Sequence, residues 1–419
     1  MLWTKFRQSL LGEKIRSLVP NNLVNLLEHL PLAVFAVLFF RYPAKNLRVI
    51  GVTGTDGKTT TATLIHSILL EAGRKAALVS TVGAKIGHEE IDTGLHVTSP
   101  DPWALQRLLR KIADMGFKDV VLESTSHGLA QNRLFGCNFK VGIITNVTHE
   151  HLDYHKTYKN YLQSKAKLFN HVQGAILNRD DESFAYLSQR IKKTQASIIT
   201  YGLDKKADFN PQNFKFCPQL TGEHNQYNCL AAAATASFLG IDRGIVKKVL
   251  EKFEGVKGRM EEIKAGQDFK IFVDFAHTPN SLTNILKTLK RITPKNKKLI
   301  AIFGSAGLRD QTKRPIMGEN AARYADTIVL TADDPRTEDV NKIIDEIASG
   351  CFKMGFEKDK NLFFIPDRQK AVEFTIRELA KKGDVVAFCG KGHEKSICYG
   401  KIDYPWSDQE AIKKILKEK

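Results

Sequence analysis

Hydrophobic residues recur along most of the chain at the spacing of short strands, each followed by a stretch with helical spacing. The first unit combines an apolar run at 48–53, a glycine-containing turn and a helical stretch that ends at Gly73. Further strands are expected at 76–80, 120–123, 142–147 and 174–178. A second series of strands is expected at 269–275, 298–304, 327–333, 362–366 and 384–390.

The order of these segments predicts the fold class. Strands that alternate with amphipathic helices favour parallel sheets covered by helices, and two such series indicate two successive α/β domains joined near Val256. We expect a short helical N-terminal extension at 1–46 and a central domain with a parallel-rich sheet at 47–257. A Rossmann-like α/β domain should follow at 258–419.

The N-terminal extension is basic and partly apolar. No cleavable signal is evident, and the apolar run at 32–40 is too short to span a bilayer. A segment of this length rarely builds its own core without disulfides or metal. We therefore expect its apolar side chains to bury against the rest of the protein, another subunit or a membrane surface. They include Leu32, Val34, Phe35, Val37, Leu38 and Phe39.

Composition narrows the function classes. Hydrophobic residues make up 42% of the chain and charged residues 26%, which is typical of globular proteins. The six cysteines are scattered without a C-x-x-C pair, which favours reduced thiols in the cytoplasm over a disulfide framework or a zinc site. The net charge is +17, but the lysines are spread along the chain. This pattern favours a solvated surface over nucleic-acid binding, and we expect a monomer that acts on small molecules.

Polar residues gather directly after the predicted strands. They occupy 56–60, 123–127, 146–153, 274–277, 333–336 and 390–394. Ligands of open α/β sheets bind beyond the carboxyl ends of the strands. If two such edges face each other, the sequence predicts one cleft between the two domains.

One glycine-containing segment, Gly51-Val-Thr-Gly-Thr-Asp-Gly-Lys-Thr-Thr60, follows a predicted strand and opens a predicted helix. Glycines let backbone N–H groups approach phosphate oxygens, and a helix N-terminus favours negative charge. Lys58 would reach the outer phosphates, and the Thr59 hydroxyl would bind Mg²⁺. The strict phosphate-loop spacing is not met because Val52 stands at the first glycine position. The context still predicts an ATP-binding loop of Gly54, Thr55, Asp56, Gly57, Lys58, Thr59 and Thr60.

Other candidate ligands follow the next strands. Glu123 ends a strand beside hydroxyl residues, a setting that suits Mg²⁺, although a strand-end glutamate also serves as a cap or an ion-pair partner. His149, His151 and His155 lie close together in the sequence and raise a zinc alternative. No cysteine or H-E-x-x-H pattern supports zinc at these histidines.

Three segments together resemble the Mur ligases: TGTDGKTT at 53–60, LESTSHGL at 122–129 and HEHLDYH at 149–155. These enzymes join an amino acid to a carboxylate through an acyl phosphate, at the expense of ATP. In the family, a lysine on the following helix is carbamylated by CO₂ and helps to bind Mg²⁺. The resemblance implies that Lys165, fourteen residues after His151, has this role rather than Lys167. It implies a metal site of Thr59, Glu123, His151 and carbamylated Lys165, and a catalytic set of Lys58, Lys165, His151 and Arg259.

Motifs in the second half extend the resemblance. They are GEHNQYN at 222–228, GRME at 258–261, VDFAHTP at 273–279, GLRDQTKRP at 307–315, DDPR at 333–336 and GKGHE at 390–394. On the ATP side the resemblance adds Asn225, Asn228, Arg259, Asp274 and His277. For a muramyl-peptide substrate it implies Thr98, Ser99, Thr125, Gln131 and Arg133. For an incoming amino acid it implies Arg309, Asp333, Asp334, Arg336, Gly390 and Glu394.

The resemblance implies an ATP- and Mg²⁺-dependent amide ligase of peptidoglycan precursor synthesis. It would add the third amino acid to a muramyl-L-Ala-D-Glu peptide. Arg336 favours meso-diaminopimelate, since a guanidinium can grip its second carboxylate with two hydrogen bonds. The motifs depart from the family pattern at Asp56, Ser99, Ser305, Ala306, Leu308 and Asp334. Asp334 in place of asparagine weakens the diaminopimelate assignment, because a second acid could favour an ammonium group.

The short N-terminal extension also departs from the family, in which a separate α/β domain holds the uridine end of the substrate. With 46 residues before the phosphate loop, we expect weaker dependence on the uridine moiety. Two alternatives stay open. One is a related ligase with another acceptor, of the pseudomurein-peptide or poly-γ-glutamate type. The other is a P-loop NTPase without ligase activity.

Overall fold

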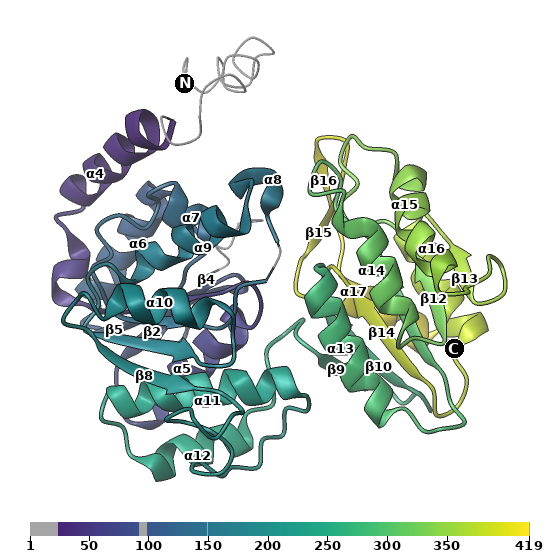
Figure 1. The fold of residues 1–419 in the computed structure, drawn as a ribbon. Coiled ribbons are helices and arrows are strands. Elements are labelled where there is room, and N and C mark those ends of the chain that lie inside the picture. The colour runs from purple at the N-terminus through teal and green to yellow at the C-terminus, as the bar shows by residue number, and fades with distance from the viewer. Residues whose placement is uncertain (1–23, 92–98, 149, 419) are drawn as a thin grey trace.

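The computed structural model describes residues 24–91, 99–148 and 150–418, and its two large sheets are built from successive parts of the chain (Figure 1). The first sheet has eight strands in the order β4-β3-β2-β5-β1-β6-β7-β8. They are β1 (Arg48–Thr53), β2 (Ala76–Ser80), β3 (Gly83–Ile86), β4 (Glu89–Ile91), β5 (Asp119–Glu123), β6 (Phe139–Ile144), β7 (Gly174–Asn178) and β8 (Ser197–Tyr201).

Strand β1 lies at the centre of this sheet, with β5 and β6 paired to it in parallel on its two sides. Central parallel strands are covered on both faces, so β1 is buried and apolar on both sides. The strand expected at 142–147 runs instead from Phe139 to Ile144, which leaves Thr145 and Asn146 beyond its end. Strands β4 and β8 were not predicted from runs of apolar residues, because β4 is polar and exposed and β8 is only partly buried.

Helices cover both faces of the first sheet. Successive strand residues point to opposite faces, so Val49 joins one core and Ile50 joins the other. The core around Ile50 packs α5, α11 and α12, and the core around Val49 packs α6, α9, η3 and α10. The helices of this part are η1 (Asn25–His29), α4 (Leu30–Phe39), η2 (Pro43–Asn46), α5 (Lys58–Glu71), α6 (Pro102–Asp114), α7 (Ser126–Ala130), α8 (Leu152–His155), α9 (Tyr158–Ala166), η3 (Lys167–Phe169), α10 (Ser183–Ile191), α11 (Glu223–Phe238) and α12 (Arg243–Lys252).

The second sheet has six strands in the order β13-β12-β11-β14-β10-β9, all parallel except β9. They are β9 (Glu261–Ile263), β10 (Lys270–Asp274), β11 (Leu299–Phe303), β12 (Thr327–Leu330), β13 (Leu362–Phe364) and β14 (Val385–Cys389), beside a hairpin of β15 (Ser396–Tyr399) and β16 (Ile402–Pro405). One face carries α13 (Pro279–Ile292), α14 (Lys313–Ala322) and α15 (Val340–Lys353), and the other carries α16 (Arg368–Phe374), η4 (Thr375–Leu379) and α17 (Asp408–Lys417). Helices on both faces of each sheet confirm the expected α/β class, with a Rossmann-like C-terminal part.

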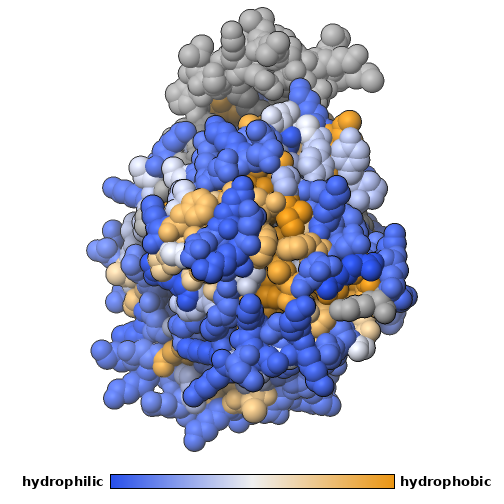
Figure 2. Space-filling model, turned by 90° about the vertical axis from the view of Figure 1, so that its right-hand side faces the viewer, coloured by the Kyte–Doolittle hydropathy of each residue, from blue (hydrophilic) through white to orange (hydrophobic). Residues whose placement is uncertain are grey.

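The side of the molecule formed by this second sheet and its helices is mostly polar. Figure 2 shows hydrophilic residues over most of that side and hydrophobic residues gathered near its middle. Exposed hydrophobic residues in this half of the chain include Ile316, Phe352 and Met354. Apolar atoms make up much of any protein surface, so exposed residues of this kind are ordinary.

The N-terminal helix α4 lies at the edge of the first domain, away from the second sheet (Figure 1). Ala33, Ala36 and Val37 are buried where α4 packs on α6. A Cβ added to Gly136 would lie 2.4 Å from Val37 Cγ2, which shows how closely this side of the helix is packed. Leu32, Phe35, Leu38 and Phe39 stay largely exposed, and Val34 is partly buried. No helix in the described part of the chain is long and apolar enough to cross a membrane.

A buried ion pair ties the strand ends of the second sheet to two helices. The Arg368 guanidinium donates to both carboxylate oxygens of Asp408, at 2.8 and 2.7 Å. It also donates to the carbonyl oxygens of Ala332 and Cys389, near the ends of β12 and β14. Both charged side chains are almost fully buried. Arg368 therefore fixes the backbone directly before two of the motifs expected to bind an amino acid.

Removal of one partner should leave the other charge buried and unpaired. We predict that Asp408→Ala lowers the free energy of unfolding by about 3–5 kcal/mol. Glu418→Ala is the matched control, because Glu418 pairs with Arg377 at the surface and such pairs contribute less than about 1 kcal/mol. Urea unfolding followed by circular dichroism measures both effects. Equal losses in the two variants would contradict the role given to Arg368.

Candidate active site

The carboxyl ends of the two sheets face one cleft of about 890 Å³. The loops after β1, β5 and β6 line one wall, and the loops after β10, β12 and β14 line the other. Most of the predicted site residues lie on these loops and line the cleft. Gly54, Ser99 and Lys165 lie behind its wall, and Thr98 and His149 are outside the described residues. The cleft expected from the strand ends is therefore present.

The loop between β1 and α5 has the geometry of a phosphate-binding turn. Gly57 has a φ of +80°, and a Cβ there would lie 2.3 Å from Asn228 Oδ1, so a side chain is excluded. The loop is held from β6: the Thr55 N–H donates to the Asn146 carbonyl oxygen at 2.8 Å, and the Asp56 N–H donates to Asn146 Oδ1 at 2.9 Å. Helix α5 then begins at Lys58, and the N-terminus of this helix points at the cleft.

Hard oxygen ligands meet at the start of α5. The Thr59 hydroxyl lies 3.0 Å from Glu123 Oε2, and the Thr81 N–H donates to the same oxygen at 3.0 Å. Both Thr59 and Glu123 are buried at the cleft wall. A hydroxyl and a carboxylate beside a phosphate-binding turn are donors that suit Mg²⁺. These two residues of the expected metal set therefore fit the ion.

The lysines of the expected catalytic set flank the phosphate-binding turn. Lys58 Nζ donates to the Thr55 carbonyl oxygen at 2.8 Å, and Lys165 Nζ donates to the Gly54 carbonyl oxygen at 2.5 Å. Lys165 is buried against the ring of Tyr161, whereas Lys167 is exposed. Burial and the charge of Lys58 hold the pKa of Lys165 well below its usual value. Both effects favour the neutral amine over the ammonium.

The described histidines pack against one another at the cleft wall. The rings of His151 and His127 lie 4.8 Å apart at the cleft wall, and burial holds both pKa values below the usual range. His155 has Ser126 Oγ at 3.1 Å from Nε2 and Ser164 Oγ at 3.3 Å from Nδ1. Among the described residues, these histidines belong to no group of three metal-ligating side chains. The third histidine of the zinc alternative, His149, lies outside the described residues, so that alternative stays a hypothesis.

Polar contacts between described residues join the two walls of the cleft. Arg259 Nη2 donates to the Thr59 hydroxyl at 3.3 Å, and its guanidinium lies 4.4 Å from the centroid of the Phe275 ring. Asn280 Nδ2 donates to Asp56 Oδ2 at 2.6 Å. These contacts bring residues of the second domain to the phosphate-binding turn.

A further contact is an ion pair within the cleft. Lys313 Nζ lies 3.2 Å from Glu150 Oε1 and donates to the His277 carbonyl oxygen at 2.9 Å. Glu150 is buried, and its second oxygen has no hydrogen-bond partner among the described residues. A buried carboxylate oxygen without a partner, in the wall of a cleft, is suited to meet a ligand.

The expected nucleotide side lies between α11 and the loop after β10. Asn228 Nδ2 donates to Asn225 Oδ1 at 3.2 Å, so these two side chains form one polar surface. Asp274 accepts from the Met260 and Ala276 N–H groups at 2.6 and 2.7 Å, which holds the loop that carries His277. All four expected residues line the cleft on the side of the phosphate-binding turn.

The expected muramyl-peptide residues form a group beyond the end of β5. Ser99 Oγ lies 2.9 Å from Thr125 Oγ1, and Arg133 Nη1 donates to the Ser99 carbonyl oxygen at 3.3 Å. Gln131 is buried, and its Oε1 has no hydrogen-bond partner among the described residues. Thr125, Gln131 and Arg133 line the cleft, while Ser99 supports them from behind.

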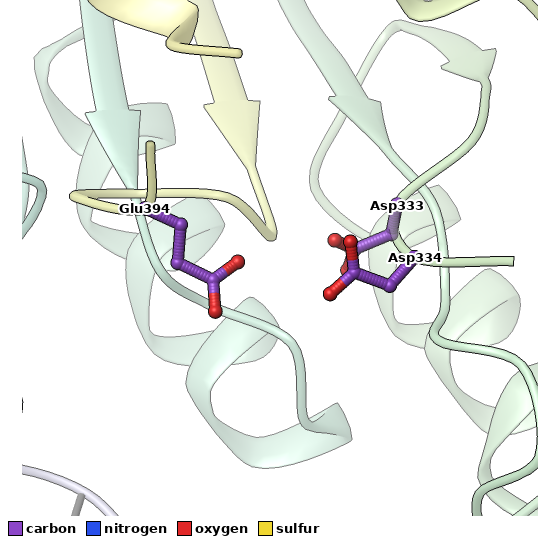
Figure 3. Close-up of side chains that lie close together, drawn as sticks. All are labelled: Asp333, Asp334 and Glu394. Atoms are coloured by element: carbon purple, nitrogen blue, oxygen red, sulfur yellow. The ribbon is translucent and has the colours of Figure 1, made fainter. Parts of the chain in front are cut away.

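The expected amino-acid residues meet on the opposite wall. Figure 3 shows the carboxylate of Glu394 pointing toward those of Asp333 and Asp334. The ligating oxygens of the three lie within 4.8 Å of one another. Arg336, at a φ of +54°, donates through Nη1 to the Gly307 carbonyl oxygen at 2.7 Å. Gly390 lets the Asp333 carboxylate lie close to the backbone, because a Cβ at this position would lie 2.9 Å from Asp333 Oδ2.

A buried lysine, missed in the sequence, occupies the centre of this acidic group. Lys391 Nζ lies 2.6 Å from Glu394 Oε2, 2.8 Å from Asp334 Oδ1 and 3.8 Å from Asp333 Oδ1. The Cys398 N–H also donates to Asp334 Oδ1 at 2.9 Å. Although burial favours the neutral acid, these contacts hold the pKa of Asp334 below its usual value. The cluster is thus an internal ion-pair network.

Comparison with known proteins identifies the family. Residues 52–236 match the model of the Mur ligase middle domain, and residues 258–392 match the Mur ligase, glutamate ligase domain. The chain is 40% identical over 398 residues to the UDP-N-acetylmuramoyl-L-alanyl-D-glutamate–2,6-diaminopimelate ligase of Aquifex aeolicus strain VF5, an alignment that covers 90% of this chain and 79% of that protein. The chain belongs to the Mur ligase family. The resemblance stated from the motifs is confirmed.

Solved structures agree with this assignment. This Mur ligase matches a structure of a UDP-N-acetylmuramoyl-L-alanyl-D-glutamate–2,6-diaminopimelate ligase with a TM-score of 0.60 and 32% identity, over 89% of this chain and 78% of that one. A pseudomurein peptide ligase type C from Methanothermus fervidus gives a TM-score of 0.63 at 19% identity, over 91% and 80% of the two chains. At that identity the likeness concerns the fold alone. As a Mur ligase, the protein is an ATP- and Mg²⁺-dependent ligase that forms carbon–nitrogen bonds.

Sequence reasoning missed several cleft residues of this Mur ligase. Asn280, Lys313 and Glu150 lie within or next to motifs that it quoted, but none was assigned a role. Asn146 was placed at the end of a strand rather than under the phosphate-binding turn. Lys391 lies inside the GKGHE motif and reads there as a solvated lysine. A burial pattern could not have found it, because its neighbours in sequence are small or polar.

The buried acid Glu394 gives this Mur ligase a pH-sensitive group. Burial raises the pKa of Glu394 to about 7, against the opposing charge of Lys391. Below pH 7 the side chain is protonated, and above pH 7 it is a carboxylate that can accept from a substrate ammonium. If Glu394 holds the incoming amino acid, ammonium binding therefore strengthens as the pH rises through about 7.

We predict that the KM for the amino acid falls by up to about tenfold per pH unit as the pH rises from 6 to 7, and levels off above 7.5. In Glu394→Gln, the KM should be higher and should lack this inflection, because the amide does not titrate. Steady-state kinetics at fixed ATP across pH 6–8 measure both. A wild-type KM that is flat over this range would sink the assignment.

Proposed function

We propose that this Mur ligase adds the third amino acid to a muramyl-L-Ala-D-Glu peptide, with formation of ADP and phosphate. The proposal rests chiefly on one observation. The phosphate-binding turn faces, across a single cleft, the pocket formed by Asp333, Asp334, Arg336 and Glu394, which we call the acid–arginine pocket. The reaction named for the relatives, a ligase of diaminopimelate and a muramyl dipeptide, supports it. We also propose that the enzyme acts as a monomer in the cytoplasm, where ATP is held.

The chemistry follows from what an amide bond requires. A carboxylate reacts poorly with an amine, because its leaving group would be oxide. Transfer of the γ-phosphoryl group of ATP to the acceptor carboxylate gives an acyl phosphate, whose leaving group is phosphate. The amine of the incoming amino acid then attacks the carbonyl carbon, and the tetrahedral intermediate collapses to the amide with loss of phosphate. Such reactions depend on positioning and electrostatics rather than on a protein nucleophile.

Cations from both walls can bring the two anionic substrates together. Lys58 belongs to the phosphate-binding turn, and Arg259 approaches Thr59 from the second domain. Burial lowers the pKa values of both side chains, but their acidic neighbours oppose the shift. In our proposal they stabilise the charge that develops on the transferred phosphoryl group.

We assign the Mg²⁺ site to Thr59, Glu123, His151 and Lys165. The ion would supply neutralisation of phosphate charge. His151 suits this role because its depressed pKa keeps the imidazole neutral and able to offer a lone pair. Lys165 fits once it is carbamylated: its amine attacks CO₂, a carbamate forms and one proton is released. The unmodified amine described above marks the position of the carbamate nitrogen.

We predict that Lys165→Met lowers kcat by more than about a thousandfold, whereas Lys167→Met stays within about twofold. Methionine keeps the buried aliphatic stem of Lys165, so the fold should survive, but it offers no carbamate oxygens. Thermal unfolding checks the fold, and ADP release measures activity. Full activity of Lys165→Met, or loss of activity in Lys167→Met alone, would reverse the assignment.

The acid–arginine pocket favours meso-diaminopimelate as the amino acid. The doubt raised by Asp334 was that its charge could attract the side-chain ammonium of lysine. In the pocket that charge is already matched by Lys391 and by the Cys398 N–H group. The backbone of Arg336 is held by two hydrogen bonds: its N–H donates to the Cys398 carbonyl oxygen, and its carbonyl oxygen accepts from the Gly400 N–H. Its guanidinium can bind a second carboxylate. A lysine substrate would leave this guanidinium without its partner.

We predict that ADP release requires both the muramyl dipeptide and an amino acid, and that DNA has no effect. The kcat/KM for meso-diaminopimelate should exceed that for lysine by at least about a hundredfold, since a site built to bind a carboxylate with a partly buried guanidinium rejects an analogue that lacks the carboxylate. Arg336→Ala should remove most of this preference. Coupled ADP assays with each amino acid measure the ratio. A preference for lysine refutes the substrate, and ADP release without an acceptor refutes the ligase itself.

A further inference from the structure

Helix α4 carries an apolar face that the described part of the protein leaves uncovered. Ala33, Ala36 and Val37 are buried on the side that meets α6. The opposite side of α4 presents Leu32, Phe35, Leu38 and Phe39, and the preceding helix η1 adds Leu27; these large hydrophobic side chains are between 46% and 70% exposed. A contiguous patch of this kind marks an interaction site, unlike apolar residues scattered singly.

Aromatic rings extend this patch onto the first turn of α6. The Trp103 ring stacks on Phe35 with centroids 6.0 Å apart, and its centroid lies 4.7 Å from that of Phe39 and 5.1 Å from that of Phe40. The ten residues of α4 include no charged side chain. We call Leu27, Leu32, Phe35, Leu38, Phe39 and Trp103 the apolar face. Aromatic and aliphatic side chains on one face of a helix are typical of helices that lie in a membrane interface.

A cationic cavity lies at the C-terminal end of the same helix. It has a volume of about 150 Å³, and its basic lining residues are Arg41, Lys45, Arg110 and Lys118. Arg110 pairs with Asp114, whereas the other three form no ion pair with any described residue. This volume holds several water molecules and so also a phosphate group.

The sequence next to α4 adds to this positive charge. Residues 1–23 contain four basic side chains and one acidic side chain. The whole chain carries a net charge of +17. Anionic lipid surfaces attract basic segments that lie beside an apolar helix. The positive charge and the apolar face thus both favour an anionic lipid surface as the partner.

We propose that α4 docks this protein on an anionic lipid bilayer. The apolar face enters the boundary between headgroups and acyl chains, and the cavity of Arg41 and Lys45 receives a lipid phosphate. A ten-residue helix is about 15 Å long, half the thickness of the hydrocarbon core, so α4 lies in the interface rather than across it. The inference stands independently of the reaction proposed above.

A second copy of this chain fits the face less well. A two-fold dimer places the same patch on both partners, so two cationic cavities would approach each other. The apolar face also comprises six side chains, against about 20–30 residues per partner in a stable interface. A bilayer requires neither a large rigid surface nor a matching set of acids.

The test is co-sedimentation of the full chain with vesicles at low salt, with partition coefficients as the readout. One vesicle type is phosphatidylcholine, and the other contains about one-third phosphatidylglycerol. We expect clear binding to the anionic vesicles and at least about tenfold loss in the double variant Leu38→Asp, Phe39→Asp. Arg41→Glu with Lys45→Glu should lose at least about tenfold on the anionic vesicles only.

Matched controls separate docking from general effects. Phe352→Asp places the same acid at an exposed phenylalanine on α15, and Lys192→Glu with Lys193→Glu makes the same change in net charge at exposed lysines after α10. Both should bind like the wild type, and all variants should share its unfolding temperature.

Four results would overturn the proposal. The first is a wild type that binds neither vesicle, and the second is equal loss in the controls. The third is a wild-type dimer, seen by light scattering, that Leu38→Asp converts to monomer. The fourth is binding of soluble glycerol phosphate without binding of vesicles, which would assign the cavity to a free anion.

Discussion

The geometry of parallel strands governs this molecule, since every parallel strand of a sheet ends on the same edge. The loops that follow β1, β5 and β6 therefore converge, and so do those after β10, β12 and β14. With the two edges face to face, loops from both sheets line one cleft. The contacts of Asn280 with Asp56, of Arg259 with Thr59 and of Lys313 with Glu150 then join the walls.

Much of this arrangement could be predicted from the sequence. Buried parallel strands are continuous apolar runs, so β1, β2 and β7 were located at their observed bounds. The phosphate-binding turn was recognisable because glycine positions and a helix start are local properties. Strands β4, β15 and β16 are short antiparallel strands, mostly exposed or only partly buried, without such a signal. Contacts such as Asn280 with Asp56 join residues 224 apart, and no local pattern encodes them.

The N-terminal segment is tied to the cleft as well as to α6. Asn25 Nδ2 lies 3.5 Å from the Tyr154 hydroxyl, and the Asn25 carbonyl oxygen accepts from Asn132 Nδ2 at 3.3 Å. Asn132 lies between Gln131 and Arg133, which line the cleft and are the residues expected to meet the acceptor peptide. The segment that leads into α4 thus also contacts that wall. A count of apolar residues in the extension could not reveal these polar contacts.

Lys391 affects where a divalent cation can bind in the cleft. Three carboxylates whose oxygens lie within 4.8 Å of one another would ordinarily sequester a divalent cation. The tethered ammonium of Lys391 already sits among them, and no diffusing ion can match its local concentration. In the proposed reaction, this leaves Mg²⁺ to the oxygens of Thr59 and Glu123, on the opposite wall from the proposed amino-acid pocket. Lys391 would then separate two kinds of positive charge, the metal ion and the substrate ammonium, between the two walls of one cavity.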